Sequence, residues 1–82
     1  MEQYFVIKNE IRPDGAVNND VVSRSTFASG LAEFFSKCAK APTNVNFTSV
    51  HVMLTDSELN VIKTEHINGA YVEPEQDNIN EG

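Results

Sequence analysis

Near its start the chain has four consecutive apolar residues, Tyr4 to Ile7, so both faces of a strand formed there are expected to start buried or half-buried. The run "YFVIKNEI", Tyr4–Ile11, is rich in aromatic and β-branched residues and predicts a first strand. In "RPDGA", which follows it, Pro13 and Gly15 favour a reversal of the chain. The next segment, "VNNDVV" (Val17–Val22), can then return as a short edge strand.

The stretch "TFASGLAEFFSKCAKAP" has the 3.6-residue period of a helix. Ser25 or Thr26 can cap its first turn, and Pro42 ends it. Gly30 lowers the helix propensity, which a close approach to a sheet would explain. The residues expected to face the core share one stripe: Phe27, Leu31, Phe34, Phe35 and Cys38.

Two apolar runs, "NVNFTSVHVML" and "LNVIKTEHI", flank the turn "TDSE" and predict a β-hairpin. Pairing Leu54 with Leu59 separates the side chains into two faces. In this register His51 and His66 are four positions apart, about 13 Å at ~3.3 Å per residue. One face carries Val50, Val52, Leu54, Leu59 and Val61, and the other carries Phe47, Ser49, His51, Met53, Asn60, Ile62, Thr64 and His66.

The order β-(β)-α-β-β predicts an α+β fold, in which one helix packs on one face of a small antiparallel or mixed sheet of three or four strands. A right-handed crossover would place the first strand parallel to the strand that begins near Val45. We expect residues 1–70 to form this single domain. Residues 71–82 predict an acidic, disordered tail.

A single helix can cover only one face of such a sheet, so the opposite face is expected to expose apolar side chains. Large exposed apolar patches usually mark an interface. Alternatively, Ala70–Val72 folds back over this face, or its apolar residues lie scattered. The residues predicted to form a protein interface there are Tyr4, Val6, Phe47, Met53 and Ile62.

The composition and charge of the chain limit the partners and the cellular compartment that we expect for it. The chain has 82 residues and a net charge of −6, but residues 73–82 hold four of the acids, and residues 1–72 hold 8 acids against 6 bases. Its bases are scattered rather than arranged in a stripe, which argues against direct nucleic-acid binding. The single Cys38, the lack of a signal-like start and the lack of an apolar run of about 20 residues predict a cytoplasmic protein outside the membrane.

Candidate chemistry is sparse, and we expect no catalytic residues, no metal site and no cofactor. Cys38 lies on the apolar stripe, where a thiol packs as a small hydrophobe. Asp56 and Glu58 belong to a turn, where nothing would raise a carboxyl pKa. The cluster "SRST" is a candidate anion site at the helix N-terminus, although the ordinary explanation is N-capping together with a solvated arginine, since no glycine-rich loop accompanies it. Its members are Ser23, Arg24, Ser25 and Thr26.

The layout "YFVIKNEIRPDGAV", a helix with aromatic pairs, "VNFTSVHVMLTDSELNVIKTEHI" and an acidic tail resembles short uncharacterised proteins of gut-bacterial phages and prophages. The resemblance implies a phage or prophage accessory protein, placed in the host cytoplasm or the virion, and it implies no catalytic residues. The leading hypothesis is a non-enzymatic interaction module that forms a homo-oligomer or binds a host protein. The alternatives are a minor or decorating virion protein, a nucleotide-sequestering protein and an enzyme.

Overall fold

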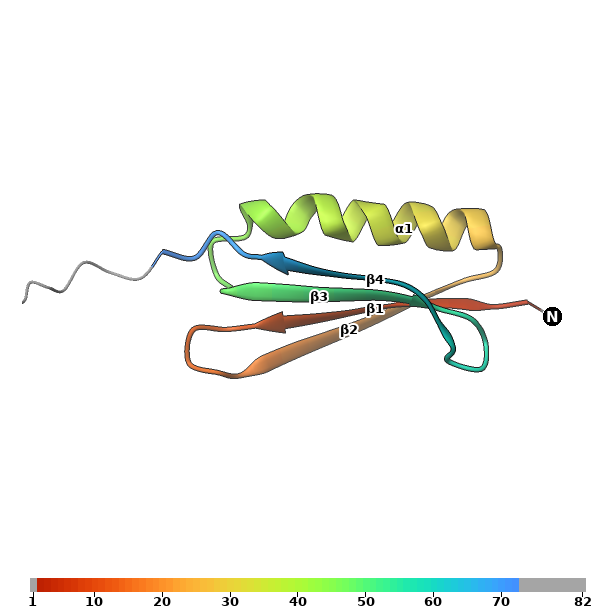
Figure 1. Ribbon diagram of the computed structural model, residues 1–82, viewed down its shortest axis with the longest axis horizontal. Coiled ribbons are helices and arrows are strands. Elements are labelled where there is room, and N and C mark those ends of the chain that lie inside the picture. The colour runs from red at the N-terminus through yellow and green to blue at the C-terminus, as the bar shows by residue number, and fades with distance from the viewer. Residues whose placement is uncertain (1, 73–82) are drawn as a thin grey trace, which may run out of the picture.

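The computed structural model describes residues 2–72, which form one four-stranded sheet with a single helix on one face (Figure 1). The strand order is β2-β1-β3-β4. The predicted α+β class is confirmed, and the second strand extends to Arg24. The elements are β1 (Tyr4–Ile11), β2 (Val17–Arg24), α1 (Phe27–Lys40), the 3₁₀ turn η1 (Ala41–Thr43), β3 (Ser49–Thr55) and β4 (Val61–Asn68).

All neighbouring strands are antiparallel, so the expected parallel placement of the first strand against the third is wrong. β2 and β3 run parallel to each other, because they lie on either side of β1 and are each antiparallel to it. The chain therefore crosses from β2 to β3 through α1. Asn18, Asn19 and Asp20 are poor strand formers. For this reason the sequence predicted that the crossover connects β1, rather than β2, to β3.

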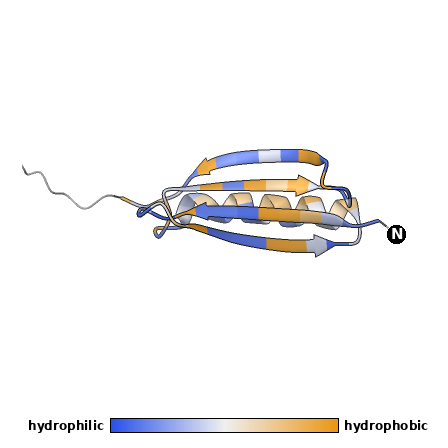
Figure 2. Cartoon of the chain, turned by 90° about the horizontal axis from the view of Figure 1, so that it is seen from below, coloured by the Kyte–Doolittle hydropathy of each residue, from blue (hydrophilic) through white to orange (hydrophobic). Residues whose placement is uncertain are grey.

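The core lies between α1 and the two central strands. In Figure 2, α1 lies behind β1 and β3, while β2 and β4 extend beyond it on either side. Tyr4, Leu31, Cys38 and Ile67 pack partly buried against this core. Its buried apolar members are Val6, Phe34, Ala41, Phe47, Val50, Val52 and Leu54.

The helix begins where the sequence predicts, and it approaches the sheet closely at Gly30. The Thr26 hydroxyl caps the first turn by accepting a hydrogen bond from the Ser29 N–H at 3.1 Å. A Cβ atom on Gly30 would lie 3.2 Å from Leu54 Cδ1 and from Tyr4 Cβ, so glycine permits this packing distance.

The predicted apolar stripe of α1 is only partly buried. Phe34 is 1% exposed, whereas Phe27 and Phe35 are 44% and 51% exposed. The reason is the position of α1 above the two central strands: the side of the helix that carries Gly30 and Phe34 meets the sheet, and the flanks extend past it. Leu31 and Cys38 lie between these extremes and are half-buried.

The β3–β4 hairpin is present, but its register differs from the predicted one by four residues. Leu54 pairs with Lys63 rather than with Leu59. The turn is longer than expected because the Asp56 carboxylate accepts hydrogen bonds from the backbone N–H groups of Glu58 and Asn60, both at 2.9 Å. Leu59 adopts a left-handed conformation (φ 67°) inside this turn. From Ser49 to Leu54 the shift of four residues leaves the side chains of β3 on their predicted faces, because strand faces alternate every two residues.

Beyond β4 the chain docks onto the loop before β3 instead of covering the free face of the sheet. The Gly69, Ala70 and Tyr71 N–H groups donate to the carbonyls of Thr48, Asn44 and Phe47 at 2.9, 2.9 and 3.2 Å. The predicted tail lies mostly outside the described residues, since these end at residue 72.

Candidate functional site

Within residues 2–72, no element packs on the sheet face opposite α1, which we call the open face (Figures 1 and 2). One end of this face is apolar. Ile7 lies directly between Val21 on β2 and Met53 on β3. Phe5 occupies the next row on β1, beside Thr55. Val21 is 58% exposed, and Phe5, Ile7 and Met53 are half-buried, so together they form a partly solvent-facing apolar patch at that end of the sheet.

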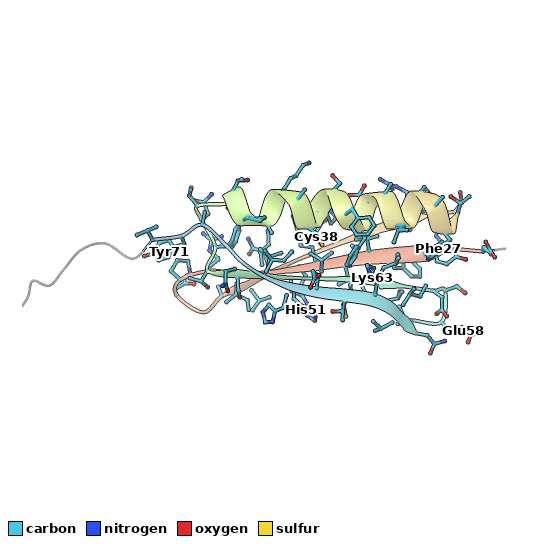
Figure 3. All side chains as sticks on the ribbon, turned by 45° about the horizontal axis from the view of Figure 1, so that its top comes forward. Phe27, Cys38, His51, Glu58, Lys63 and Tyr71 are labelled. Carbon is cyan, nitrogen blue, oxygen red and sulfur yellow. The ribbon has the colours of Figure 1, made fainter. Side chains whose placement is uncertain are left out.

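The other end of the open face is polar. His51 pairs directly with His66, and their ring centroids are 5.4 Å apart. The His51 ring also shares a hydrogen bond of 2.6 Å between its Nε2 and the Thr64 hydroxyl. In Figure 3 the His51 ring lies on the side of the sheet away from α1. The predicted 13 Å separation of the two histidines is therefore wrong, because it depended on the incorrect hairpin register.

These two histidines do not assemble a metal site with other residues. Among residues 2–72, no group of three or more histidine, cysteine or acidic side chains is placed to hold a metal ion. Two imidazoles alone leave a tetrahedral ion half-ligated. The pair is instead a polar cross-strand contact at one end of the open face.

The structure changes the membership of the predicted interface. Val6 is fully buried in the core, beside Leu54 and beneath α1. Tyr4 lies on the same side of β1 and packs edge-on against Phe27, with ring centroids 5.8 Å apart. Phe47 precedes β3 and is buried in the core cluster. These three residues do not belong to the open face.

Met53 keeps its predicted place on the open face, and Ile62, 44% exposed, lies beside it at the irregularity where β3 and β4 change register. Phe5 and Ile7 take the positions that were expected for Tyr4 and Val6. Tyr4 to Ile7 are four consecutive apolar residues, so their pattern does not show which alternate pair points inward. The partner strand decides it, since Val6 pairs with Leu54 and Ile7 with Met53.

The four residues of the predicted anion site do not converge. Ser23 pairs with Phe5 across the sheet, and Arg24 donates to the Glu33 carboxylate at 3.0 Å. The Thr26 hydroxyl is occupied in capping the helix, and Ser25 is exposed. The N-capping alternative therefore accounts for the local geometry.

A cluster of ion pairs joins α1 to β2, and only one of its contacts, the i, i+4 pair of Glu33 and Lys37, could be recognised from local sequence spacing. The Lys37 ammonium lies 3.0 Å from Asp20 and 3.3 Å from Glu33, and Arg24 pairs with the same Glu33. A small cavity of about 160 Å³ adjoins the cluster. It is lined by Lys8, Glu10, Glu33, Lys37, Lys40, Ala41, Asn44 and Val50.

The electrostatics of this cluster favour its charged state. Burial opposes the charge on Lys37, but hydrogen bonds to Asp20 and Glu33 outweigh that cost and raise the lysine pKa. The hydrogen bond from Lys37 likewise lowers the pKa of Asp20. Both groups stay ionised and paired at neutral pH, so the cluster is suited to holding α1 on the sheet and not to moving a proton.

Cys38 has none of the features of a reactive thiol. It is half-buried at the edge of the core, and burial raises its pKa, with Glu65 adding to the shift. A nucleophilic cysteine needs surroundings that lower the thiol pKa. Figure 3 shows Cys38 on α1 and Lys63 on β4 on the same side of the molecule.

No protein-family model, curated protein or solved structure matches this chain. Among the described residues, no helix is both long and apolar enough to cross a membrane.

Proposed function

We propose that this chain is a small non-enzymatic interaction module that binds another protein chain through the open face of its sheet. The observation that supports it is the row of Val21, Ile7 and Met53 with Phe5 beside it, which faces solvent at one end of the sheet. Patches of this kind usually mark an interface. The partner is a second copy or a protein of the host cell.

The resemblance to short phage and prophage proteins supports a setting in an infected or lysogenic bacterium. The alternative within that setting is a minor or decorating virion protein that uses the same face for assembly. Detection of the chain in purified particles would favour the virion alternative, and its restriction to the cell would favour an accessory factor.

Met53→Glu tests the proposal. A carboxylate in the centre of a closed apolar contact loses its hydration without gaining a partner, which costs several kcal/mol, whereas on an open sheet face it stays hydrated. The variant should keep the melting temperature of the parent within a few degrees and lose the bound partner. Solution mass and retention of bacterial proteins measure the binding, and thermal unfolding measures the fold.

Asn19→Glu is the matched control, since it places the same charge on the polar part of the same face. Binding by Asn19→Glu should resemble that of the parent. The proposal fails if the parent is monomeric and retains no partner, or if Met53→Glu unfolds the protein. It also fails if both variants reduce binding equally, because the apolar patch would then have no special role.

A further inference from the structure

We propose that the outer edge of β4 pairs with β4 of a second copy, so that two chains form one continuous eight-stranded antiparallel sheet. This inference rests on the proposed interaction module and specifies one partner and one surface for it. Edge strands present unpaired backbone N–H and C=O groups that can pair with another chain. β4 is an edge strand of eight residues, four of them β-branched.

A two-fold axis restricts which residues can meet in such a pair. Directly opposed residues of antiparallel strands point to the same side of the sheet. On β4, Lys63, Glu65 and Ile67 face the side that carries α1, because their partners Leu54, Val52 and Val50 lie there. Thr64 and His66 face the other side, opposite Met53 and His51. The symmetric registers are therefore those in which one residue of β4 lies opposite its own copy.

The register centred on Thr64 is self-complementary. It places Lys63 opposite Glu65 of the partner copy, and the symmetry repeats this pair, so two Lys–Glu pairs flank the axis. It also places Val61 opposite the partner's Ile67 on both sides of the axis, which adds two aliphatic pairs. Opposite-charge and apolar cross-strand pairs both stabilise antiparallel sheets.

The two neighbouring registers are unfavourable. With the centre on Lys63, the two lysines lie opposite each other, and with the centre on Glu65, the two glutamates do. Like charges in directly opposed positions destabilise a strand pair. Among these three central registers, the side-chain sequence of β4 therefore favours the one centred on Thr64, as a specific homodimer requires.

The other edge of the sheet is less suited to pairing. On β2, the symmetric register that opposes unlike charges is centred on Val22 and pairs only residues 20–24. Its two charged groups, Asp20 and Arg24, are already engaged in ion pairs with Lys37 and Glu33 of α1. On β4, by contrast, Lys63 and Glu65 lie opposite the apolar Leu54 and Val52 and form no ion pair among the described residues, although the Lys63 ammonium also lies 5.8 Å from the centroid of the Phe35 ring.

A charge exchange tests the register. Lys63→Glu and Glu65→Lys each replace two attractive pairs by two repulsive ones, and we expect each to raise the dimer dissociation constant about tenfold or more. The double variant restores two opposite-charge pairs and should recover most of the parental dimer. Sedimentation over a wide concentration range measures the association. Independent additive losses in the double variant would overturn the inference.

A cysteine placed on the axis provides a second test. Directly opposed Cα atoms lie about 4.5 or about 5.5 Å apart in antiparallel strands, and disulfides form over about 4.4–6.8 Å. In a Cys38→Ser background, Thr64→Cys should therefore give a disulfide-linked dimer under mild oxidation. Asn19→Cys, on the other edge strand, is the matched control and should remain uncrosslinked. Equal crosslinking of both variants would show random collision and overturn the inference.

The outcomes separate this inference from the proposed function. If the charge variants and the cysteine have no effect while Met53→Glu abolishes binding, the edge pairing is wrong and the open-face module stands. If the edge variants dissociate the dimer and Met53→Glu does not, the edge pairing stands alone. An assembly that grows beyond a dimer would indicate pairing of β4 with β2 in an open chain and would refute the two-fold pair.

Discussion

Phe34 and Phe35 provide an internally controlled test of which side of α1 stabilises the fold. The two residues are adjacent and chemically identical, and their rings contact each other edge-on with centroids 5.5 Å apart. Phe34 is 1% exposed and Phe35 is 51% exposed. Changing each to alanine removes the same atoms and the same ring contact, so the two variants differ mainly in burial and in the contact that Phe35 makes with Lys63.

The expected costs follow from that difference. Complete truncation of a buried phenylalanine destabilises a protein by about 3–5 kcal/mol, because a cavity remains. Full burial of a large apolar side chain contributes about 1.5–3 kcal/mol, so the half-exposed Phe35 should lose about 1 kcal/mol of it. Phe35→Ala also loses the contact with Lys63, whose ammonium lies 5.8 Å from the ring centroid. This adds up to about 1 kcal/mol. We therefore expect Phe34→Ala to cost about 2 kcal/mol more than Phe35→Ala.

Urea unfolding followed by far-UV circular dichroism measures both free energies of unfolding. At roughly 0.05–0.15 kcal/mol per residue, the whole stability of an 82-residue chain is about 4–12 kcal/mol. Phe34→Ala is therefore expected to be partly unfolded. The pair Phe34→Leu and Phe35→Leu keeps the comparison measurable, because these changes remove less volume. Equal losses in both pairs, or a larger loss at Phe35, would refute the assigned packing of α1.

Two further predictions concern the ends of β4. Gly69→Ala should lower the melting temperature and the hydrogen-exchange protection of the Ala70 amide, because the new Cβ would clash with the Phe47 carbonyl oxygen. Asn68→Ala is the control, and an unchanged Ala70 amide would contradict the prediction. Hydrogen bonds from Asn60 and Glu58 lower the pKa of Asp56 below its usual value near 4. The ionised carboxylate therefore stabilises the folded protein above that pH. This stabilisation is lost as the pH falls through the lowered pKa of the folded state. Asp56→Ala should thus be less stable than the parent at neutral pH and depend less on pH in acid, whereas parallel melting curves across pH would contradict this.

The element order and the strand faces of the hairpin followed from short-range patterns. The alternation in "SVHVML" and the 3.6-residue stripe of α1 depend only on neighbouring residues, so they were readable without the partner elements. Thr26 as a cap and Gly30 as a point of close approach were also local signals, and both are confirmed. Even with the wrong register, Met53 stayed on its predicted face, because the error was an even number of residues.

Tertiary pairing decided the remaining features. The run Tyr4–Ile7 is apolar at every position, so only its pairing with Leu54 and Met53 shows that Val6 is core and Ile7 is surface. Local sequence also does not set the hairpin register. The Asp56 side chain lengthened the turn and thereby brought His51 opposite His66. The candidate surfaces depend on the same strand pairing and register. Both the apolar row around Ile7 and the exposed edge of β4 exist only when strands distant in sequence are paired. Long-range backbone pairing is the physical step that a single sequence leaves open, because several registers satisfy the same hydrophobic pattern.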